Sequence, residues 1–268
     1  MYREAAELKL YLTVERGCSS LYKPNLEFIR TFSGTQGFEI DKTISVNAIS
    51  LDELIKKERL ENIDFIKIDV QGAELDVLKG GEKFLSENIL GMELEVEFQQ
   101  QYLEQPLFSE VDDYVRNKMS LEIQDLKKYY WKHPEGLHFG SAKGKLIFGE
   151  ALYLRSPENL DNFCRQYFQR EAKDKLLIAV LIGVVYGFFD YSLAILERNR
   201  STGIIKNNEI DSLVKAIKVY GKGLRYNGKL SVYISEIFRL FYRMFQPTEG
   251  GGSIGQPLGS RKKFGIFY

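Results

Sequence analysis

The stretch "NIDFIKIDVQGAELDVLKGG", from Asn62 to Gly81, constrains the fold of this 268-residue chain more than any other. Residues Ile63–Val70 form a nearly continuous apolar run of strand length, as expected for a strand that is covered on both faces. Gly72 then turns the chain, a helix is predicted from Ala73 to Lys79, and the Gly80–Gly81 pair breaks or ends that helix. A buried strand followed at once by a helix predicts an α/β fold.

The flanking segments continue this alternation. Strand patterns occur in "ELKLYLT", "KTISVNAI", "GMELEVEF", "SLEIQDL" and "KGKLIFGEALYLR". Short helices are predicted in "VDDYVRNK" and from Ser50 to about Arg59, where Ser50 and Glu53 form a capping box. We expect parallel crossovers in the first part and an antiparallel edge made by the last two strands. A long loop between those two strands carries Trp131, His133 and His138.

Charged residues recur within these strands. In "GMELEVEF" the apolar side chains of Met92, Leu94, Val96 and Phe98 face one way, and those of Glu93, Glu95 and Glu97 face the other. Lys67 places a charge inside the buried strand and therefore requires a partner. Asp69 or a glutamate of the neighbouring strand is expected to supply it.

After Pro157 the pattern changes to helices only. Helical apolar spacing extends over residues 159–186, 190–198, 208–220 and 229–245, and a glycine-rich tail follows. We expect three parts: an α/β domain in residues 1–156, a helical extension in 157–247 and a flexible tail in 248–268.

The segment from Leu176 to Leu196 contains 21 residues and only one charge, Asp190. Its length permits a membrane-spanning helix, and Gly183 and Gly187 have the spacing of a membrane-helix contact. The alternative is a buried helical hairpin in which Gly187 ends the first helix and Asp190 caps the second. We expect the hairpin, because an acid inside a membrane is costly whereas a cap stabilises.

The amino-acid composition disfavours some classes of binding partner. Lys plus Arg and Asp plus Glu number 37 each, so no net charge favours nucleic acid or an acidic membrane surface. The two cysteines, Cys18 and Cys164, suggest reduced thiols in a cytoplasmic protein, and the first residues lack the apolar core of a signal peptide.

Three short motifs carry little weight. Gly250, Gly252 and Gly255 have dinucleotide-motif spacing but lack the strand–turn–helix context, and "GSAKGK" matches a phosphate loop only loosely. His133 and His138 have no cysteine nearby, so we expect no metal site.

Asp69 is the strongest candidate for chemistry. In open α/β sheets, ligands bind beyond the carboxyl ends of parallel strands, and Asp69 lies at such an end. Glu74 lies in the first turn of the next helix. The alternative is a structural network of Lys67, Asp69 and the glutamate row, with Glu74 only favouring the helix N-terminus.

The stretch "DFIKIDVQGAELDVLKGG" resembles the signature of the FkbM family of S-adenosylmethionine-dependent methyltransferases. "LYLTVERGCSSLYKPN", "ISLDEL" and "GKLIFGEALYLR" are similar to further segments of that family, so the resemblance covers about residues 5–156. Gln71 stands where many members have Glu, which implies a weaker acid network.

The resemblance implies a Rossmann-like methyltransferase sheet that binds S-adenosylmethionine and methylates a hydroxyl oxygen of a natural product or glycan. It places Asp69 beside both the methyl donor and the acceptor, as base or orienter of the hydroxyl, with Glu74 as support. Ser19, Ser20, Asn25 and Lys67 are expected to line the substrate pocket.

The family's glycine-rich donor loop and the acid ending its second strand do not precede Glu7. Three explanations remain open: a fragment of a longer enzyme, which we favour; a sheet completed by another copy or chain; or a half-domain without catalysis. A second function class is an interaction module built on the C-terminal helices.

Overall fold

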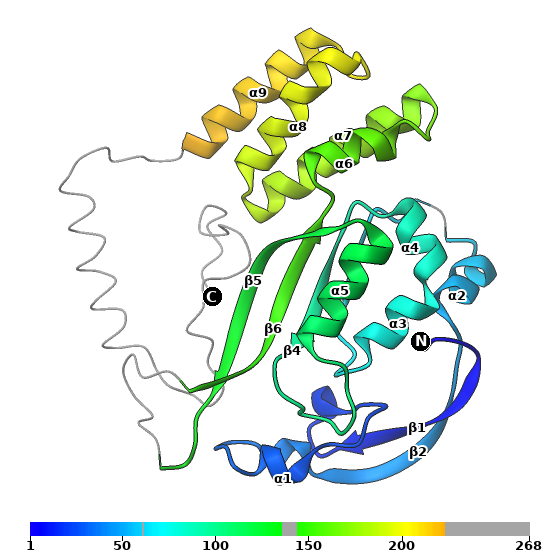
Figure 1. Cartoon of the computed structure of the whole chain (residues 1–268), viewed down its shortest axis with the longest axis vertical. Coiled ribbons are helices and arrows are strands. Elements are labelled where there is room, and N and C mark those ends of the chain that lie inside the picture. The colour runs from blue at the N-terminus through cyan, green and yellow to red at the C-terminus, as the bar shows by residue number, and fades with distance from the viewer. Residues whose placement is uncertain (61, 136–143, 223–268) are drawn as a thin grey trace, which may run out of the picture. The chain divides into compact units, whose positions relative to one another are not determined.

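A computed structural model describes residues 1–60, 62–135 and 144–222 of the chain (Figure 1). The chain divides after Leu154 into two compact units.

The first unit is built on a four-stranded sheet in the order β3-β4-β6-β5. Its strands are β3 (Phe65–Ile68), β4 (Gly91–Glu97), β5 (Glu122–Trp131) and β6 (Lys145–Leu154). The pair β3–β4 is parallel, whereas β4–β6 and β5–β6 are antiparallel. The mixed α/β sheet with an antiparallel edge is therefore confirmed. Trp131 ends β5, so its assignment to the loop was wrong.

The first two strands of the chain do not join this sheet. Among the described strands, β1 (Ala6–Thr13) and β2 (Ile40–Ala48) form a separate antiparallel pair, with Ala6 opposite Ala48. Tyr11 of β1 also forms a single antiparallel bridge with Ser20. Short helical turns lie between them: η1 (Arg16–Cys18), α1 (Leu26–Ile29) and η2 (Gln36–Phe38). The expected parallel crossover from the second strand to Ile63–Val70 is wrong. Alternating polar residues suit a ribbon with one solvated face, and the sequence period does not select the partner.

β3 is shorter than expected and forms an edge of the sheet. Ile68 is 3% exposed, but Lys67 on the other face is about half exposed. The prediction that both faces are covered is therefore wrong for the Lys67 face. A lysine ammonium stays in water when its stem alone is covered.

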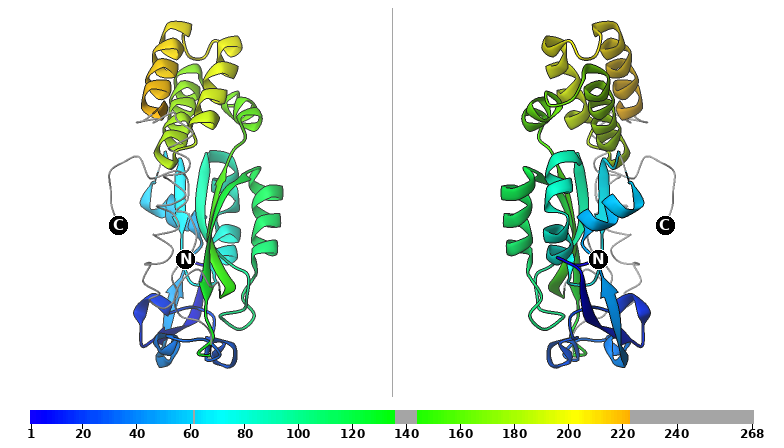
Figure 2. Two further views of the ribbon diagram at one scale, coloured as in Figure 1. Left: turned by 90° about the vertical axis from the view of Figure 1, so that its left-hand side faces the viewer. Right: turned by 90° about the vertical axis from the view of Figure 1, so that its right-hand side faces the viewer.

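Helices cover the apolar face of the sheet. They are α3 (Glu74–Gly80), α4 (Glu82–Asn88) and α5 (Phe108–Met119), and α2 (Leu51–Glu58) packs beside them (Figures 1 and 2). The core joins Met92, Leu94 and Val96 of β4 to apolar side chains of these helices. Burial of this apolar surface is the main driving force for the fold of the unit.

Two local predictions in these helices are confirmed. Ser50 Oγ accepts from the Glu53 backbone N–H at 3.1 Å, and Glu53 Oε2 accepts from the Ser50 N–H at 3.1 Å. This is the predicted capping box of α2. The Gly80–Gly81 pair separates α3 from α4.

The second unit contains α6 (Pro157–Cys164), α7 (Gln169–Tyr186), α8 (Phe189–Thr202) and α9 (Asn207–Lys222). The single helix expected over 159–186 is wrong, because the chain breaks between α6 and α7. There the Tyr167 N–H bonds to the Cys164 carbonyl at 3.2 Å, and Phe168 becomes the N-cap of α7. The helix predicted at 229–245 and the glycine-rich tail lie outside the described residues.

The expected hairpin is confirmed. Gly187 adopts φ +84° and ends α7, its N–H bonding back to carbonyls of the last turn. Asp190 is not the cap of α8, contrary to prediction: Phe188 is the N-cap, and Asp190 lies in the first turn, where it favours the helix dipole. Among the helices of the described segments, none is long and apolar enough to cross a bilayer.

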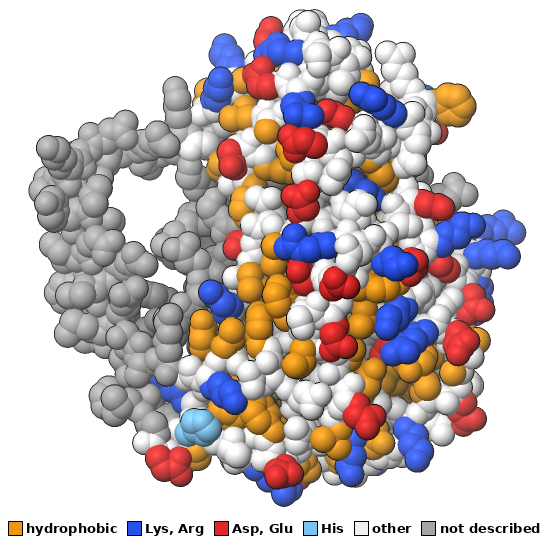
Figure 3. Space-filling view, in the orientation of Figure 1, with side chains coloured by type: hydrophobic (Ala, Val, Ile, Leu, Met, Phe, Trp, Pro, Cys, Tyr) orange, Lys and Arg blue, Asp and Glu red, His pale blue; other side chains and the backbone are white. Residues whose placement is uncertain are grey.

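Charged side chains of both signs are interspersed on the face drawn in Figure 3. Both cysteines are free thiols.

Candidate active site

The candidate site lies where the parallel strands β3 and β4 end. Asp69 follows β3 directly, Glu97 is the last residue of β4, and Glu74 is the first residue of α3. Because parallel strands end at the same edge of a sheet, the three carboxylates gather there. Asp69 is exposed, whereas Glu74 and Glu97 are each 1% exposed.

A tight turn connects β3 to α3. Gln71 and Gly72 adopt φ values of +57° and +97°, a region that disfavours side chains and that only glycine enters freely. A Cβ atom on Gly72 would come within 3.3 Å of Tyr102 Cδ2, so the turn also fits closely against the loop after β4. A non-glycine residue held in this conformation is often found at functional sites.

The Gln71 side chain links the carboxylates. Its Nε2 donates to Asp69 Oδ1 at 2.9 Å and to Glu95 Oε2 at 2.8 Å. Its Oε1 accepts from Tyr102 Oη at 3.0 Å. An amide can bridge two carboxylates in this way, whereas a glutamate at the same position would add a third negative charge.

Glu74 stabilises the turn through a hydrogen bond to its backbone. Its Oε1 accepts from the Val70 backbone N–H at 2.8 Å. Burial raises the pKa of Glu74 to about 7, while backbone N–H groups of the turn act in the opposite direction. The side chain therefore has a structural task in addition to any role in chemistry.

Glu95 and Glu97 complete the acidic group. Burial, followed by the charges of Asp69 and Glu74, raises the pKa of Glu95 to about 9. Burial and the charges of Glu74 and Glu95 raise the pKa of Glu97 well above its usual range. One carboxylate oxygen from each of Glu74, Glu95 and Glu97 lies within 4.8 Å of the other two.

The same face of the sheet carries two ion pairs. Lys67 Nζ lies 2.7 Å from Glu93 Oε1, so the expected partner from the neighbouring strand is confirmed. Lys127 Nζ lies 3.1 Å from Glu150 Oε2, and Tyr129 Oη donates to the other oxygen of Glu150 at 3.0 Å. The Lys67–Glu93 pair is part of the structural network that was the alternative interpretation of the charged row.

Of the serine and asparagine residues predicted to line the pocket, one contacts the β3–α3 turn and the others bond elsewhere. Ser20 is buried, and its Oγ donates to the Gln71 carbonyl at 2.6 Å, so it supports the turn. Ser19 Oγ instead accepts from the Thr13 N–H at 3.1 Å. Asn25 caps α1, and its Nδ2 donates to the Gln100 carbonyl at 3.0 Å.

Two residues of the site escaped the sequence reasoning. Tyr102 is 1% exposed, bonds to Gln71, and also donates to the Cys18 carbonyl at 2.9 Å. Gln105 is buried against the same turn, with its Cβ 3.4 Å from the position of a Gly72 Cβ. Both follow β4, whose carboxyl end lies beside that of β3, so the strand-end rule points to the segment that carries them.

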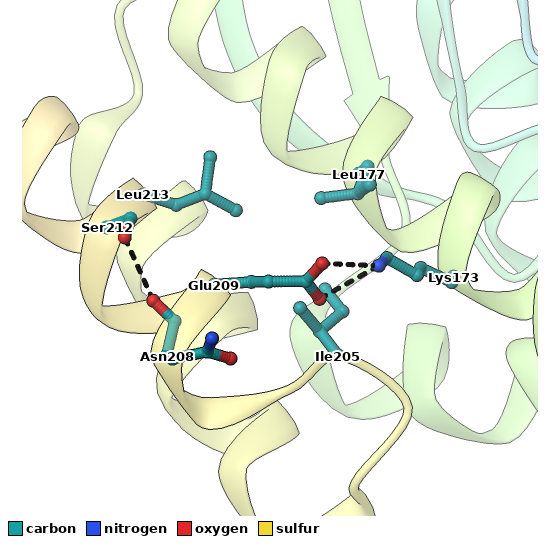
Figure 4. A pocket seen from close by; sticks show the side chains of 7 residues that line it. All are labelled: Lys173, Leu177, Ile205, Asn208, Glu209, Ser212 and Leu213. Carbon is teal, nitrogen blue, oxygen red and sulfur yellow. Dashed lines mark hydrogen bonds and ion pairs between the residues drawn. The ribbon is translucent and has the colours of Figure 1, made fainter.

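Other candidate positions show no comparable cluster. His133 is bonded to the Thr31 carbonyl at 2.8 Å and stacked on Phe32, and His138 and the tail glycines lie outside the described residues. A hollow of about 370 Å³ in the second unit is lined by residues of α7, α9 and the α8–α9 turn: Lys173, Leu177, Ile205, Asn208, Glu209, Ser212 and Leu213 (Figure 4). Its charged groups, Lys173 and Glu209, neutralise each other at 2.8 Å.

Residues 6–120 match the family model described as the methyltransferase FkbM domain. The match includes β1 to α5 and therefore the strand ends that hold Asp69, Glu74, Glu95 and Glu97. Neither a curated protein nor a solved structure matches the chain. Residues 6–120 of this chain thus contain a methyltransferase FkbM domain.

Proposed function

We propose that the chain takes part in S-adenosylmethionine-dependent methylation of a hydroxyl oxygen on a glycan or a natural product. The FkbM domain supports methyl transfer in general. The observation that carries the finer proposal is the exposed Asp69 carboxylate, held at the strand end beside Glu95 and Gln71.

The acidic strand ends suit a cationic donor. S-adenosylmethionine supplies a methyl group from a positively charged sulfonium, and negative side chains attract that charge. Asp69 is exposed at this strand end and is therefore available to such a ligand. We assign Asp69 to this contact.

The residues of the chain then have distinct tasks. Asp69 accepts the proton of the acceptor hydroxyl or orients that hydroxyl, a task for which a carboxylate within hydrogen-bond reach is suited. Gln71 fixes Asp69 through the 2.9 Å bond, and Glu74 fixes the turn through Val70. Lys67 is half exposed on the same face and is proposed to contact a polar acceptor.

The test is transfer of a labelled methyl group by the full chain to a panel of sugars and hydroxylated natural products. Asp69→Asn keeps the shape of the side chain and removes its basicity, so we expect turnover to fall by about 10²–10⁴-fold. Asp113→Asn, on the exposed face of α5 and bonded only to Asn117 among the described contacts, is the matched control. Equal turnover of Asp69→Asn and the control would contradict the assignment.

Localisation and partners remain part of the proposal. Free thiols and balanced charge are compatible with a cytoplasmic protein that binds small molecules and no nucleic acid. Fractionation of the producing cells tests the compartment. Recovery with the membrane fraction would contradict it.

A second candidate is an interaction module in the helical unit. Among its described residues, five large apolar side chains are exposed, namely Phe168, Leu181, Val185, Val219 and Tyr220. Exposed apolar side chains of this kind bind another protein where they form one continuous patch. The two candidates differ in one measurement. Binding of S-adenosylmethionine by the full chain supports the enzyme, and absence of binding together with self-association of the chain supports the module.

A further inference from the structure

The carboxylates of Glu74, Glu95 and Glu97 come from two elements and converge on one point. Glu74 begins α3, while Glu95 and Glu97 lie two residues apart on the same face of β4. One oxygen from each lies within 4.8 Å of the other two. Ionised carboxylates that approach so closely repel one another, so either protons or a bound cation must neutralise them.

Glu97 supplies an independent observation. It is 1% exposed, and its Oε1 is buried and accepts no hydrogen bond from the described part of the chain. Buried carboxylate oxygens are almost always bonded, and each exception requires an explanation such as an ion. One oxygen of the same Glu97 carboxylate belongs to the converging group, so this incompletely bonded carboxylate supports a ligand at that place.

The nearby lysines do not neutralise the carboxylates of these three glutamates. Lys67 is paired with Glu93, and Lys127 with Glu150. Over residues 1–60, 62–135 and 144–222, no Lys or Arg forms an ion pair with any of the three glutamates.

We propose that Glu74, Glu95 and Glu97 bind a hard divalent cation of the magnesium or calcium type. Such ions prefer carboxylate oxygens, at about 2.0–2.6 Å, so opposite ligand oxygens lie about 4–5 Å apart, a span that matches the cluster. The set contains no nitrogen or sulfur ligand, which disfavours zinc. Partial exposure of Glu95 leaves a route for the ion and for additional ligands.

The competing explanation is that protons neutralise the cluster. Burial raises the pKa values of all three glutamates, and a protonated carboxyl needs no counter-ion. The two explanations differ in a measurable way, since a cation displaces these protons at neutral pH and a purely protonated cluster binds no metal.

The cation site also suggests a role, which rests on the proposed methylation of a hydroxyl. A hydroxyl oxygen bound to the ion would lose its proton more readily. Asp69 adjoins Glu95 and would accept that proton. Binding of the ion is nevertheless measured without donor or acceptor, so its failure is distinguishable from failure of the methylation proposal.

The experiment is a titration of the full chain with Mn²⁺ at about pH 7.5, in which electron paramagnetic resonance measures the bound and free Mn²⁺. Mg²⁺ is then added as a competitor. We expect one Mn²⁺ per chain, and Glu97→Gln and Glu95→Gln each to weaken binding by about tenfold or more, because a ligand is lost. Glu122→Gln, an exposed carboxylate at the start of β5, is the control and should change the affinity less than about twofold.

Two results would overturn the proposal. The first is a folded wild-type chain that binds no Mn²⁺ at about 1 mM, which would indicate a protonated cluster. The second is binding that Glu95→Gln leaves unchanged, which would indicate ions elsewhere on the surface. If Glu97→Gln does not fold, the Mn²⁺ affinity of Glu95→Gln alone tests the proposal. Glu95 is partly exposed, so its substitution is better tolerated. Dependence of methyl transfer on Mg²⁺ then tests the role separately.

Discussion

At the scale of single residues, the turn at Gln71 and Gly72 determines where the acidic side chains meet. Gln71 bridges Asp69 and Glu95 through one amide nitrogen, and Tyr102 anchors the amide oxygen. Gly72 allows the turn to approach Tyr102 and Gln105 closely. The carboxylates are thus held by neutral hydrogen-bonding groups and not by lysine or arginine.

Replacement of Gly72 tests the turn. Alanine at this position would be strained at φ +97° and would crowd Tyr102 Cδ2 at 3.3 Å. We expect Gly72→Ala to lower the free energy of unfolding by about 1–2 kcal/mol, measured by urea unfolding. Gly17→Ala is the control, because nothing lies within 4 Å of its Cβ position, and it should change stability by less than about 0.5 kcal/mol. Equal effects would show that the turn is not constrained.

The reactivity of Cys18 tests the environment behind this turn. Burial, followed by the charges of Glu15 and Glu95, raises the pKa of Cys18 from 9.0 to about 11. Below pH 9 the folded chain should therefore contain about a hundredfold less thiolate than an unperturbed thiol and react correspondingly slowly with iodoacetamide. The raised pKa stabilises the folded state at lower pH, and this contribution is lost as the pH rises toward 11.

Mass spectrometry of the labelled peptides measures the rate, with the urea-unfolded chain as control. Labelling of Cys18 at the same rate in the folded and unfolded chain would contradict the described environment.

Part of the site was predictable residue by residue. Asp69 and Glu74 follow from the strand-end rule and the family resemblance. The convergence of Glu95 and Glu97 did not follow, because alternation along β4 assigns faces but does not say that the glutamate face is buried as well. The positive φ of Gln71 also gives no sequence signal, since glutamine rarely adopts it.

At the scale of elements, two connections define the units. The β3–α3–α4–β4 crossover places two strand ends at one edge, and the Gly187 turn folds α7 onto α8. Gly183 lies where α7 packs against α8, next to Tyr191 and Ser192. Leu176, Val180 and Leu196 of this segment are buried in the helical unit, whereas Leu181 and Val185 are exposed.

Gly183→Ala tests the hairpin. The added Cβ would lie 2.8 Å from Tyr191 Cδ1 and would also crowd Ser192 Oγ, so these side chains or the helix that carries them must shift. We expect a loss of about 1–3 kcal/mol in urea unfolding followed by far-UV circular dichroism. Leu181→Ala on the exposed side of the same helix is the control and should cost less than about 0.5 kcal/mol. A neutral Gly183→Ala would mean that α7 and α8 do not pack as described.

The type of most elements was predictable, whereas partners and boundaries were not. The capping box and the Gly80–Gly81 and Gly187 breaks are local signals, and all three hold. The pairing of β1 with β2 depends on contacts distant in sequence, which periodicity does not encode. The break between α6 and α7 contains neither glycine nor proline, so no local signal marked it.

At the scale of the whole molecule, the FkbM domain match lies entirely in the first unit. The helical unit lies outside that match, and its apolar hollow and exposed side chains leave an interaction role as the second candidate. The central claim is that the strand ends around Asp69 bind a methyl donor. This claim is tested on the full chain, which contains both units.

The most direct measurement is calorimetric titration of the full chain with S-adenosylmethionine, with Asp69→Asn and Asp113→Asn in parallel. We predict saturable binding at one site, weakened about 3–10-fold by Asp69→Asn, because the sulfonium loses one nearby negative charge, and unchanged by Asp113→Asn. Absence of binding at about 1 mM donor, a concentration at which even a weak site would be occupied, would contradict the account. Equal binding by Asp69→Asn and wild type would place the donor elsewhere.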